Sequence, residues 1–160
     1  MLETLIALVI AATFLACNYA SNARVWALVK ASLESNCINR TINGRAEQLR
    51  SATFAQLTDA TYIRDTIFAT APDAAGDAGG LFETIDVIAY PMPSPSVQSL
   101  QVTRSNTTGT ATAVGTGDGT MPAQQGVRVN IKANWTAKGG QAHTRQISMF
   151  FAPGGISGQH

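Results

Sequence analysis

The side chains that could perform chemistry are few and scattered along the chain. The two histidines, His143 and His160, stand apart, and neither has cysteines or several carboxylates near it in the sequence. A protein metal site normally gathers several His, Cys, Asp or Glu ligands. We therefore expect no bound metal, and no motif in the chain predicts a cofactor.

Two glycine- and aspartate-containing segments are the next places where a ligand could bind. The segment GTGDGT at 115–120 lacks the lysine of a phosphate-binding loop and the ligand series of an EF-hand, so we expect a turn. Asp73 and Asp77 lie in the loop-like segment 71–80, where we expect solvated carboxylates. With no Gly-x-Ser-x-Gly elbow and no nucleophile–base pair, the chain is predicted not to be an enzyme.

Three N-x-[ST] sequons begin at Asn39, Asn106 and Asn134. Such sequons also occur by chance in a chain rich in Asn and Thr. They mark candidate glycosylation sites, and the predicted loop at Asn106 suits modification best.

Glu3 is the acidic residue with the most unusual neighbours in the sequence. The segment from Thr4 to Ala23 contains no charged residue. A carboxylate inside an apolar segment is costly unless it is paired. The residues alone are explained if Glu3 lies at the membrane surface, near the start of the chain.

The element that carries Glu3 is predicted to be a helix able to cross a membrane. Residues 1–23 are long enough to cross a membrane, because about 18–20 apolar residues span the hydrocarbon layer. A helix also satisfies its own backbone hydrogen bonds there. Arg24 is the first positive charge, and Arg24, Trp26 and Lys30 are suited to the edge of a bilayer.

Residues 24–70 are expected to continue the helix as an amphipathic extension. Apolar residues recur there at three- and four-residue spacing, first at Val25, Leu28, Val29 and Leu33, and later at Leu49, Phe54, Leu57, Ile63 and Ile67. Gly44 is the expected place for a kink or a short interruption.

The two cysteines, Cys17 and Cys37, are predicted to be free thiols. A separation of twenty residues along one helix is about 30 Å. A disulfide needs Cα atoms within about 7 Å. A bridge between subunits is the alternative.

After a loop predicted at 71–80, residues 81–160 are expected to form a small antiparallel sheet of three to five strands. The strand-like segments are 81–90, 99–105, 108–114, 126–136 and 143–152. In the fourth of them, strict alternation places four apolar residues on one side, namely Val127, Val129, Ile131 and Ala133. Gly139–Gly140 predicts a hairpin turn after it. The predicted fold class is α+β, a long N-terminal hydrophobic helix packed at its C-terminal half on this sheet.

The chain resembles the type IV filament superfamily, which includes pilins, minor pilins and the pseudopilins of type II secretion. The likeness lies in the order of the elements and in the stretches LETLIALVI, AEQLRS, VRVNIKANWTAKGG and HTRQISMFFAPGG. Three features differ from the family pattern. Glu3 is the third residue where the family has its glutamate fifth, the basic leader ending in glycine is missing, and Ala20 stands near the place of a helix-loosening proline.

The resemblance implies a structural subunit that is held in the inner membrane and then joins an extracellular filament on the cell surface. Its partners would be copies of itself, other pilins and the assembly machinery. The implied assembly contact consists of residues at the start of the helix, namely Met1, Glu3, Leu5, Ile6, Leu8 and Val9. Glu3 would face the N-terminal amine of a neighbouring subunit, and the filament would serve adhesion, motility, DNA uptake or secretion.

Two other functions are compatible with the same sequence. The first is a membrane-anchored extracytoplasmic binding domain that never polymerises. The second is a lipoprotein acylated at Cys17, which the acidic Glu3 and the missing basic segment argue against. The net charge of +1, with charged residues forming 13% of the chain, gives no sign of the strongly basic surface that nucleic acids favour.

Overall fold

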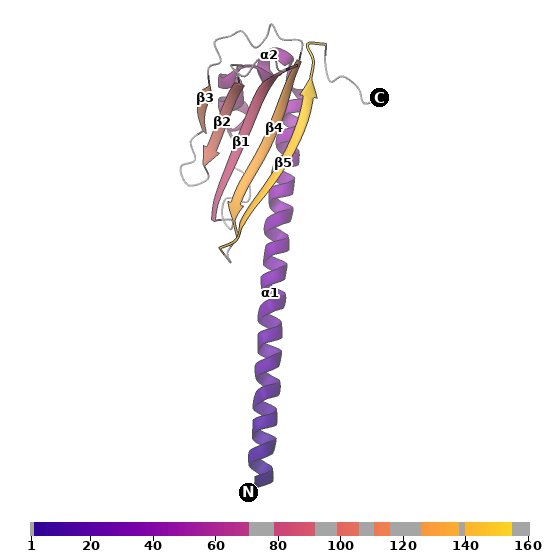
Figure 1. Ribbon diagram of the computed structural model, residues 1–160, viewed down its shortest axis with the longest axis vertical. Coiled ribbons are helices and arrows are strands. Elements are labelled where there is room, and N and C mark those ends of the chain that lie inside the picture. Colours follow the sequence, from indigo (N-terminus) through magenta and orange to yellow (C-terminus); the bar gives the residue numbers. More distant parts are fainter. Residues whose placement is uncertain are drawn as a thin grey trace. The chain divides into compact units, whose positions relative to one another are not determined.

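One α-helix, α1, runs from Leu2 to Ser51 and includes both the apolar run and much of the predicted extension (Figure 1). The computed structural model describes residues 2–70, 79–91, 99–105, 111–115, 126–137 and 140–154. The chain divides into two units, Met1–Asn36 and Cys37–His160, so α1 contributes to both.

The expected interruption at Gly44 is wrong, because α1 continues through it for another seven residues to Ser51. Gly44 is exposed and has nothing within 4 Å of the place where a side chain would begin. A glycine inside a helix costs about 1 kcal/mol relative to alanine. Burial of Ile42, Ala46 and Leu49 on the same turns offsets that cost.

The helix predicted up to residue 70 is divided after Ser51 into short separate segments. Thr53 begins a separate short helix, α2 (Phe54–Leu57), through a capping box in which Gln56 N donates to Thr53 Oγ1 and Thr53 N donates to Gln56 Oε1 at 2.8 Å. Side-chain caps of this kind compete with the backbone bonds of a continuous helix. Thr53 therefore starts a new helix two residues after α1 ends.

A second cap produces the last helical pieces. Asp59 accepts a hydrogen bond from Thr61 N at 2.8 Å and starts α3 (Ala60–Tyr62), which passes into a π-helical turn, η1 (Ile63–Ile67). Ile63 and Ile67 are buried, as the apolar spacing predicted.

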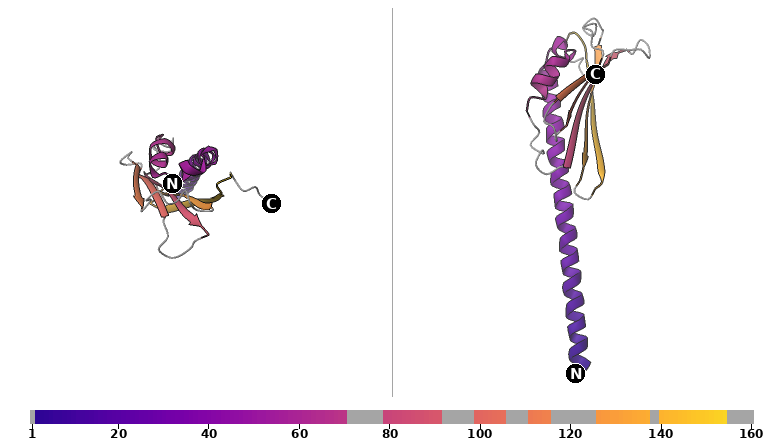
Figure 2. Two further views of the ribbon diagram at one scale, coloured as in Figure 1. Left: turned by 90° about the horizontal axis from the view of Figure 1, so that it is seen from above. Right: turned by 90° about the vertical axis from the view of Figure 1, so that its left-hand side faces the viewer.

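The second unit is built on a five-stranded antiparallel sheet with the order β3-β2-β1-β4-β5. The strands are β1 (Gly79–Tyr90), β2 (Ser99–Ser105), β3 (Ala111–Gly115), β4 (Gly126–Thr136) and β5 (Ala142–Phe151). The second part of α1 and the short helices lie on one face of this sheet (Figure 2). The α+β fold class with segregated helices and strands is therefore confirmed.

Alternation along the strands decides which side chains enter the core. Val127, Val129, Ile131 and Ala133 of β4 are all buried, which confirms the alternation predicted for that strand. They join one apolar cluster with the inward residues of β1 and β2 and with a stripe of α1 that consists of Ile38, Ile42, Ala46 and Leu49. The spacing of that stripe is the spacing of one helix face.

The hairpin between β4 and β5 forms where Gly139–Gly140 predicted it. Ala137 N donates to Gln141 O at 2.9 Å, Gly140 N donates to Ala137 O at 2.8 Å, and Gly140 has a φ of 78° that suits glycine. At the other end of β4, a Cβ on Gly126 would lie 2.9 Å from the carbonyl oxygen of Phe151. Only glycine fits there without a shift of the backbone.

Several predicted features lie outside the described residues. These are most of the 71–80 loop with Asp73 and Asp77, the segment after Gly115 in GTGDGT, Asn106, and the tail with His160. Cys17 and Cys37 are not bonded to each other, and the alternative of a bridge between subunits stays a prediction.

Candidate assembly surface

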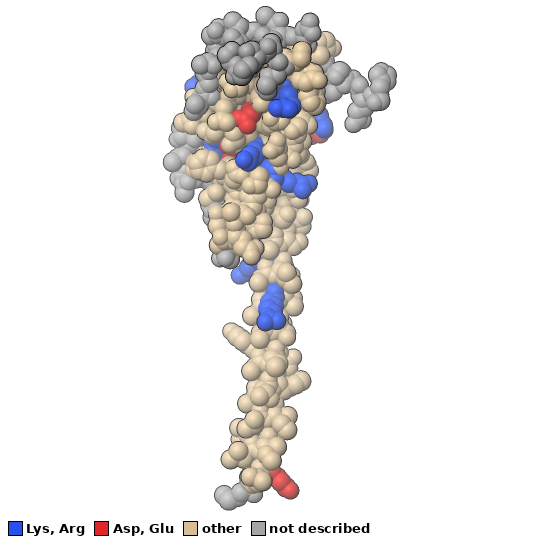
Figure 3. Space-filling model, in the orientation of Figure 1, with Lys and Arg blue, Asp and Glu red and all other residues tan. Residues whose placement is uncertain are grey.

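The first unit exposes apolar side chains around the whole circumference of α1. Each residue from Leu2 to Leu33 is exposed. A red carboxylate near the start of the helix is followed by a long uncharged surface and then by basic groups (Figure 3). The helix is long and apolar enough to cross a membrane. A soluble helix normally has only one apolar stripe, so this surface requires lipid or protein around it.

Two polar side chains inside the apolar run bond to their own helix. Thr13 Oγ1 donates to Ile10 O at 2.9 Å, and Asn18 Nδ2 donates to Phe14 O at 3.0 Å. A hydroxyl or amide that is satisfied within its own helix adds little to the cost of leaving water. These residues therefore do not prevent the helix from entering an apolar environment.

The predicted assembly residues encircle one end of α1 and are not gathered into a pocket. Leu5, Ile6, Leu8 and Val9 are between 50% and 72% exposed. Glu3 lies in the first turn of α1, where the helix dipole favours a negative charge, and it makes no ion pair among the described residues. Met1 lies outside the described residues.

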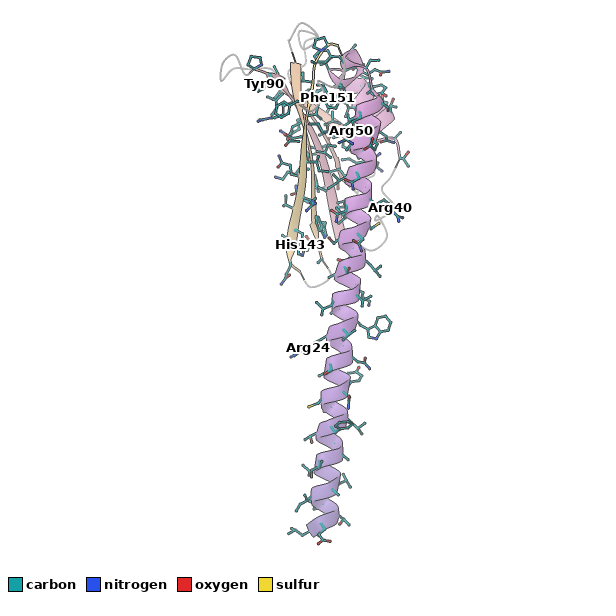
Figure 4. The ribbon with its side chains drawn as sticks, turned by 90° about the vertical axis from the view of Figure 1, so that its right-hand side faces the viewer. Arg24, Arg40, Arg50, Tyr90, His143 and Phe151 are labelled. Atoms are coloured by element: carbon teal, nitrogen blue, oxygen red, sulfur yellow. The ribbon has the colours of Figure 1, made fainter. Side chains whose placement is uncertain are left out.

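The exposed apolar surface continues beyond the first positive charge. Arg24 is exposed, and its side chain projects away from the helix (Figure 4). Five large apolar residues after it are between 42% and 71% exposed, namely Val25, Trp26, Leu28, Val29 and Leu33. Sequence spacing placed Val25, Leu28, Val29 and Leu33 on one apolar face, and within the chain that face stays exposed. They are free to contact another molecule.

Sequence reasoning missed a buried charged cluster in the second unit. Arg45 of α1, Glu83 of β1 and Arg104 of β2 are each no more than 5% exposed. Arg45 Nε donates to Glu83 Oε1 at 3.2 Å, and its guanidinium lies over the ring of Phe68. The pair connects the packed part of α1 to the central strand of the sheet.

The two arginines of this cluster also hold the segment that follows η1. Arg45 donates to Ile67 O and, at 2.6 Å, to Thr70 O. Arg104 Nη1 donates to Phe68 O at 2.8 Å and to Thr70 O at 2.5 Å. Burial lowers the pKa of Arg104, and the charge of Arg45 adds to this effect while Glu83 opposes it. The cluster fixes the fold and has no exposed reactive group.

A signal for this cluster was present in the sequence. Glu83 occupies an inward position of β1, between Leu81 and Ile85. Arg104 follows Leu100 and Val102 at the same two-residue spacing of β2. A charged residue in an apolar alternation predicts a buried partner of opposite charge.

The candidate modification and metal residues are dispersed. Asn39 lies half-buried within α1, and Asn134 lies on β4, where its side-chain oxygen accepts from Thr144 Oγ1 at 2.8 Å. His143 stacks on Trp135 with ring centroids 5.2 Å apart. Among the described residues, no three His, Cys, Asp or Glu side chains are grouped as a metal site would require.

No protein-family model matches the chain, and neither a curated protein nor a solved structure matches it. The fold class and the exposed helix therefore carry the functional argument.

Proposed function

We propose that the chain is a subunit of a type IV pilus-like extracellular filament. In this proposal the first unit lies in a membrane before assembly and later packs against the same helix of other subunits. The observation that carries the proposal is the exposed apolar surface of α1, which continues past Arg24 to Leu33.

A bilayer accounts for only part of this surface. The residues from Leu2 to Ala23 form about 33 Å of helix, close to the roughly 30 Å of the hydrocarbon layer. The next apolar residues lie between Val25 and Leu33. Arg24 precedes this stretch and Lys30 lies within it, and both cations belong at the membrane surface or in water. Contact with another protein would cover these apolar residues, which a bilayer does not reach.

Glu3 adds the requirement for a partner of opposite charge. A helix bundle excludes water from the carboxylate, and leaving a buried charge without its partner costs about 3–5 kcal/mol. The resemblance to pilins implies that the partner is the N-terminal amine of a neighbouring subunit. Pairing of that kind favours certain offsets between neighbours and disfavours the others.

Cellular partners follow from the same proposal. The subunit would start in the inner membrane, meet an assembly machinery and join copies of itself or other pilins. The filament would serve adhesion, motility, DNA uptake or secretion. The proposal assigns the chain a mechanical role and no catalytic one.

Electron microscopy of negatively stained, sheared surface material tests the proposal. We expect filaments that contain the wild-type chain, and a loss of most filaments in Glu3→Ala with the second unit still folded. Glu47→Ala is the matched control, because Glu47 is an exposed glutamate of the packed part of α1. Normal filament yield from Glu3→Ala would count against the proposal.

A second variant separates filament assembly from simple anchoring. Leu28→Gln changes an exposed residue beyond the predicted membrane span, so membrane fractionation should stay normal while filament yield falls. A membrane-anchored domain that never polymerises predicts no filaments in any of these strains. That outcome would overturn the proposal in favour of this alternative.

A further inference from the structure

The charged residues of the exposed helix have a spacing that indicates how far neighbouring subunits are offset. Glu3 and Arg24 are three heptads apart, which is about 31 Å along the helix. Both side chains are exposed. They are the first acidic and the first basic residue of the chain, and only uncharged residues lie between them.

Heptad spacing keeps Glu3 and Arg24 on one side of α1. A straight helix drifts by about 20° per heptad, and a left-handed supercoil of two helices removes that drift. The positions between them on the same seam are Ile6, Ile10, Thr13, Cys17 and Ala20, and the seam continues beyond Arg24 with Ala27 and Ala31. All of these residues are exposed, whereas the next seam position, Glu34, is buried.

We propose that two parallel copies of α1 pack along this seam with an offset of three heptads, so that Glu3 of one subunit pairs with Arg24 of the next. The proposal rests on the proposed filament function and names one intersubunit contact within it. The occupant of the seam is therefore a second copy of this chain. Opposite charges meet at one end of the overlap, and the carboxylate gains a cation that the chain itself provides.

The side chains within the overlap also match in size at this offset. Ile6 would lie level with Ala27 of the neighbour, and Ile10 level with Ala31. A large side chain then faces a small one at both levels, which allows the two backbones to approach closely. An offset shorter by one heptad would place Glu3 level with Cys17 and leave the carboxylate without a charged partner.

The pair does not exclude a contact between Glu3 and a neighbour's N-terminal amine. A carboxylate has two oxygens and accepts several hydrogen bonds. The amine contact requires an offset of only a few residues, so it would involve a different neighbour in the same filament. The alternative role of Arg24 is an anchor at the membrane surface. Exchanging the charges of Glu3 and Arg24 distinguishes that role from pairing.

The first test exchanges the two charges in the full-length chain, expressed with its own assembly machinery. We expect Glu3→Arg and Arg24→Glu each to lower filament yield at least tenfold, and the double variant to restore it to within about threefold of wild type. Lys30→Glu is the matched control, because Lys30 is the next basic residue and lies off the seam. The double variant of Glu3→Arg and Lys30→Glu should not restore filament yield.

The second test measures the offset by cysteine crosslinking in sheared filaments. In a Cys17→Ser, Cys37→Ser background, Ile10→Cys combined with Ala31→Cys should give intersubunit dimers on oxidation. Leu8→Cys combined with Val29→Cys is the control, because it has the same separation on a different side of the helix. The control should remain monomeric.

The outcomes distinguish this inference from the proposed function. Filaments that form normally but show neither charge rescue nor the Ile10–Ala31 crosslink would overturn the three-heptad contact and leave the filament function standing. An absence of filaments from the wild-type chain under conditions that support pilus growth would overturn both. Crosslinking of the control pair as efficiently as the test pair would also overturn the proposed seam.

Discussion

The two parts of α1 are both apolar, yet they have opposite surroundings. From Ile38 to Leu49 the apolar residues form one stripe that is buried by the sheet and short helices of the same chain. From Leu2 to Leu33 they surround the helix and stay exposed. A single chain can cover one stripe of a helix, whereas a helix that is apolar on all sides needs neighbours all around it.

The two units also differ in the environment of their glutamates. Glu83 of the second unit is buried and has Arg45 as its partner within the chain. Glu3 of the first unit is exposed and has no ion pair among the described residues. The second unit therefore completes its own core and pairs its buried glutamate, whereas within the chain the apolar surface and the glutamate of the first unit both stay exposed.

Removal of the buried carboxylate should give the largest effect on folding. Glu83→Gln leaves Arg45 and Arg104 without a buried counter-charge, so we expect a loss of about 3–5 kcal/mol in the free energy of unfolding. Urea unfolding in mild detergent, followed by Trp135 fluorescence in a Trp26→Phe background, measures it. Glu47→Gln, at an exposed pair with Arg50, should cost no more than about 1 kcal/mol. Equal losses from both would contradict the buried cluster as described.

Two matched leucines test the comparison within α1 itself. Leu49 is fully buried, so Leu49→Ala should destabilise the second unit by about 2–5 kcal/mol. Leu28 is 71% exposed, and Leu28→Ala should change the same unfolding energy by no more than about 0.5 kcal/mol. A similar loss from both would show that the exposed part of α1 stabilises the second unit.

The close approach beside Gly126 provides a test confined to the second unit. Gly126→Ala places a Cβ against the carbonyl oxygen of Phe151, so the β4–β5 pair must shift. We expect a loss of about 1–3 kcal/mol in the same urea experiment. Filament assembly should be affected only as far as the second unit unfolds. Gly44→Ala is the control, since Gly44 has open space around it and should gain up to about 1 kcal/mol.

The smallest effect is expected where the packed part of α1 ends. Thr53→Ala removes the side-chain half of the capping box at α2 and should cost about 1 kcal/mol. Thermal unfolding of the purified chain measures the change as a lower midpoint. Thr53→Ser keeps the hydroxyl and should behave like wild type, so a loss equal to that of the alanine variant would refute the cap.

Much of the fold could be predicted from periodicity alone. The alternation of 126–136 gave the buried face of β4, and the apolar run at the start gave the exposed part of α1. Helix boundaries after Ser51 could not be predicted from spacing, because the apolar period continues while Thr53 and Asp59 cap new segments. Local hydrogen bonds there override a pattern that is averaged over several turns.

The strand order and the charged cluster needed three-dimensional information. β1 lies between β2 and β4, and no local pattern states that Glu83 and Arg45 meet across 38 positions of the chain. The inward position of Glu83 predicts a buried partner, but it does not identify Arg45 as that partner. The helix at the start of the chain was easier to predict, because its apolar run is a local feature of the sequence.

The distance from Glu3 to Arg24 nearly equals the thickness of a hydrocarbon layer, about 31 Å against roughly 30 Å. A helix that spans a bilayer would then hold Glu3 at one surface and Arg24 at the other. In the proposed assembly, a subunit that moves outward by one layer thickness would bring its Glu3 level with Arg24 of the next subunit. The carboxylate would begin the step beside water and end it beside the guanidinium, so the spacing of these two residues would set the length of the step.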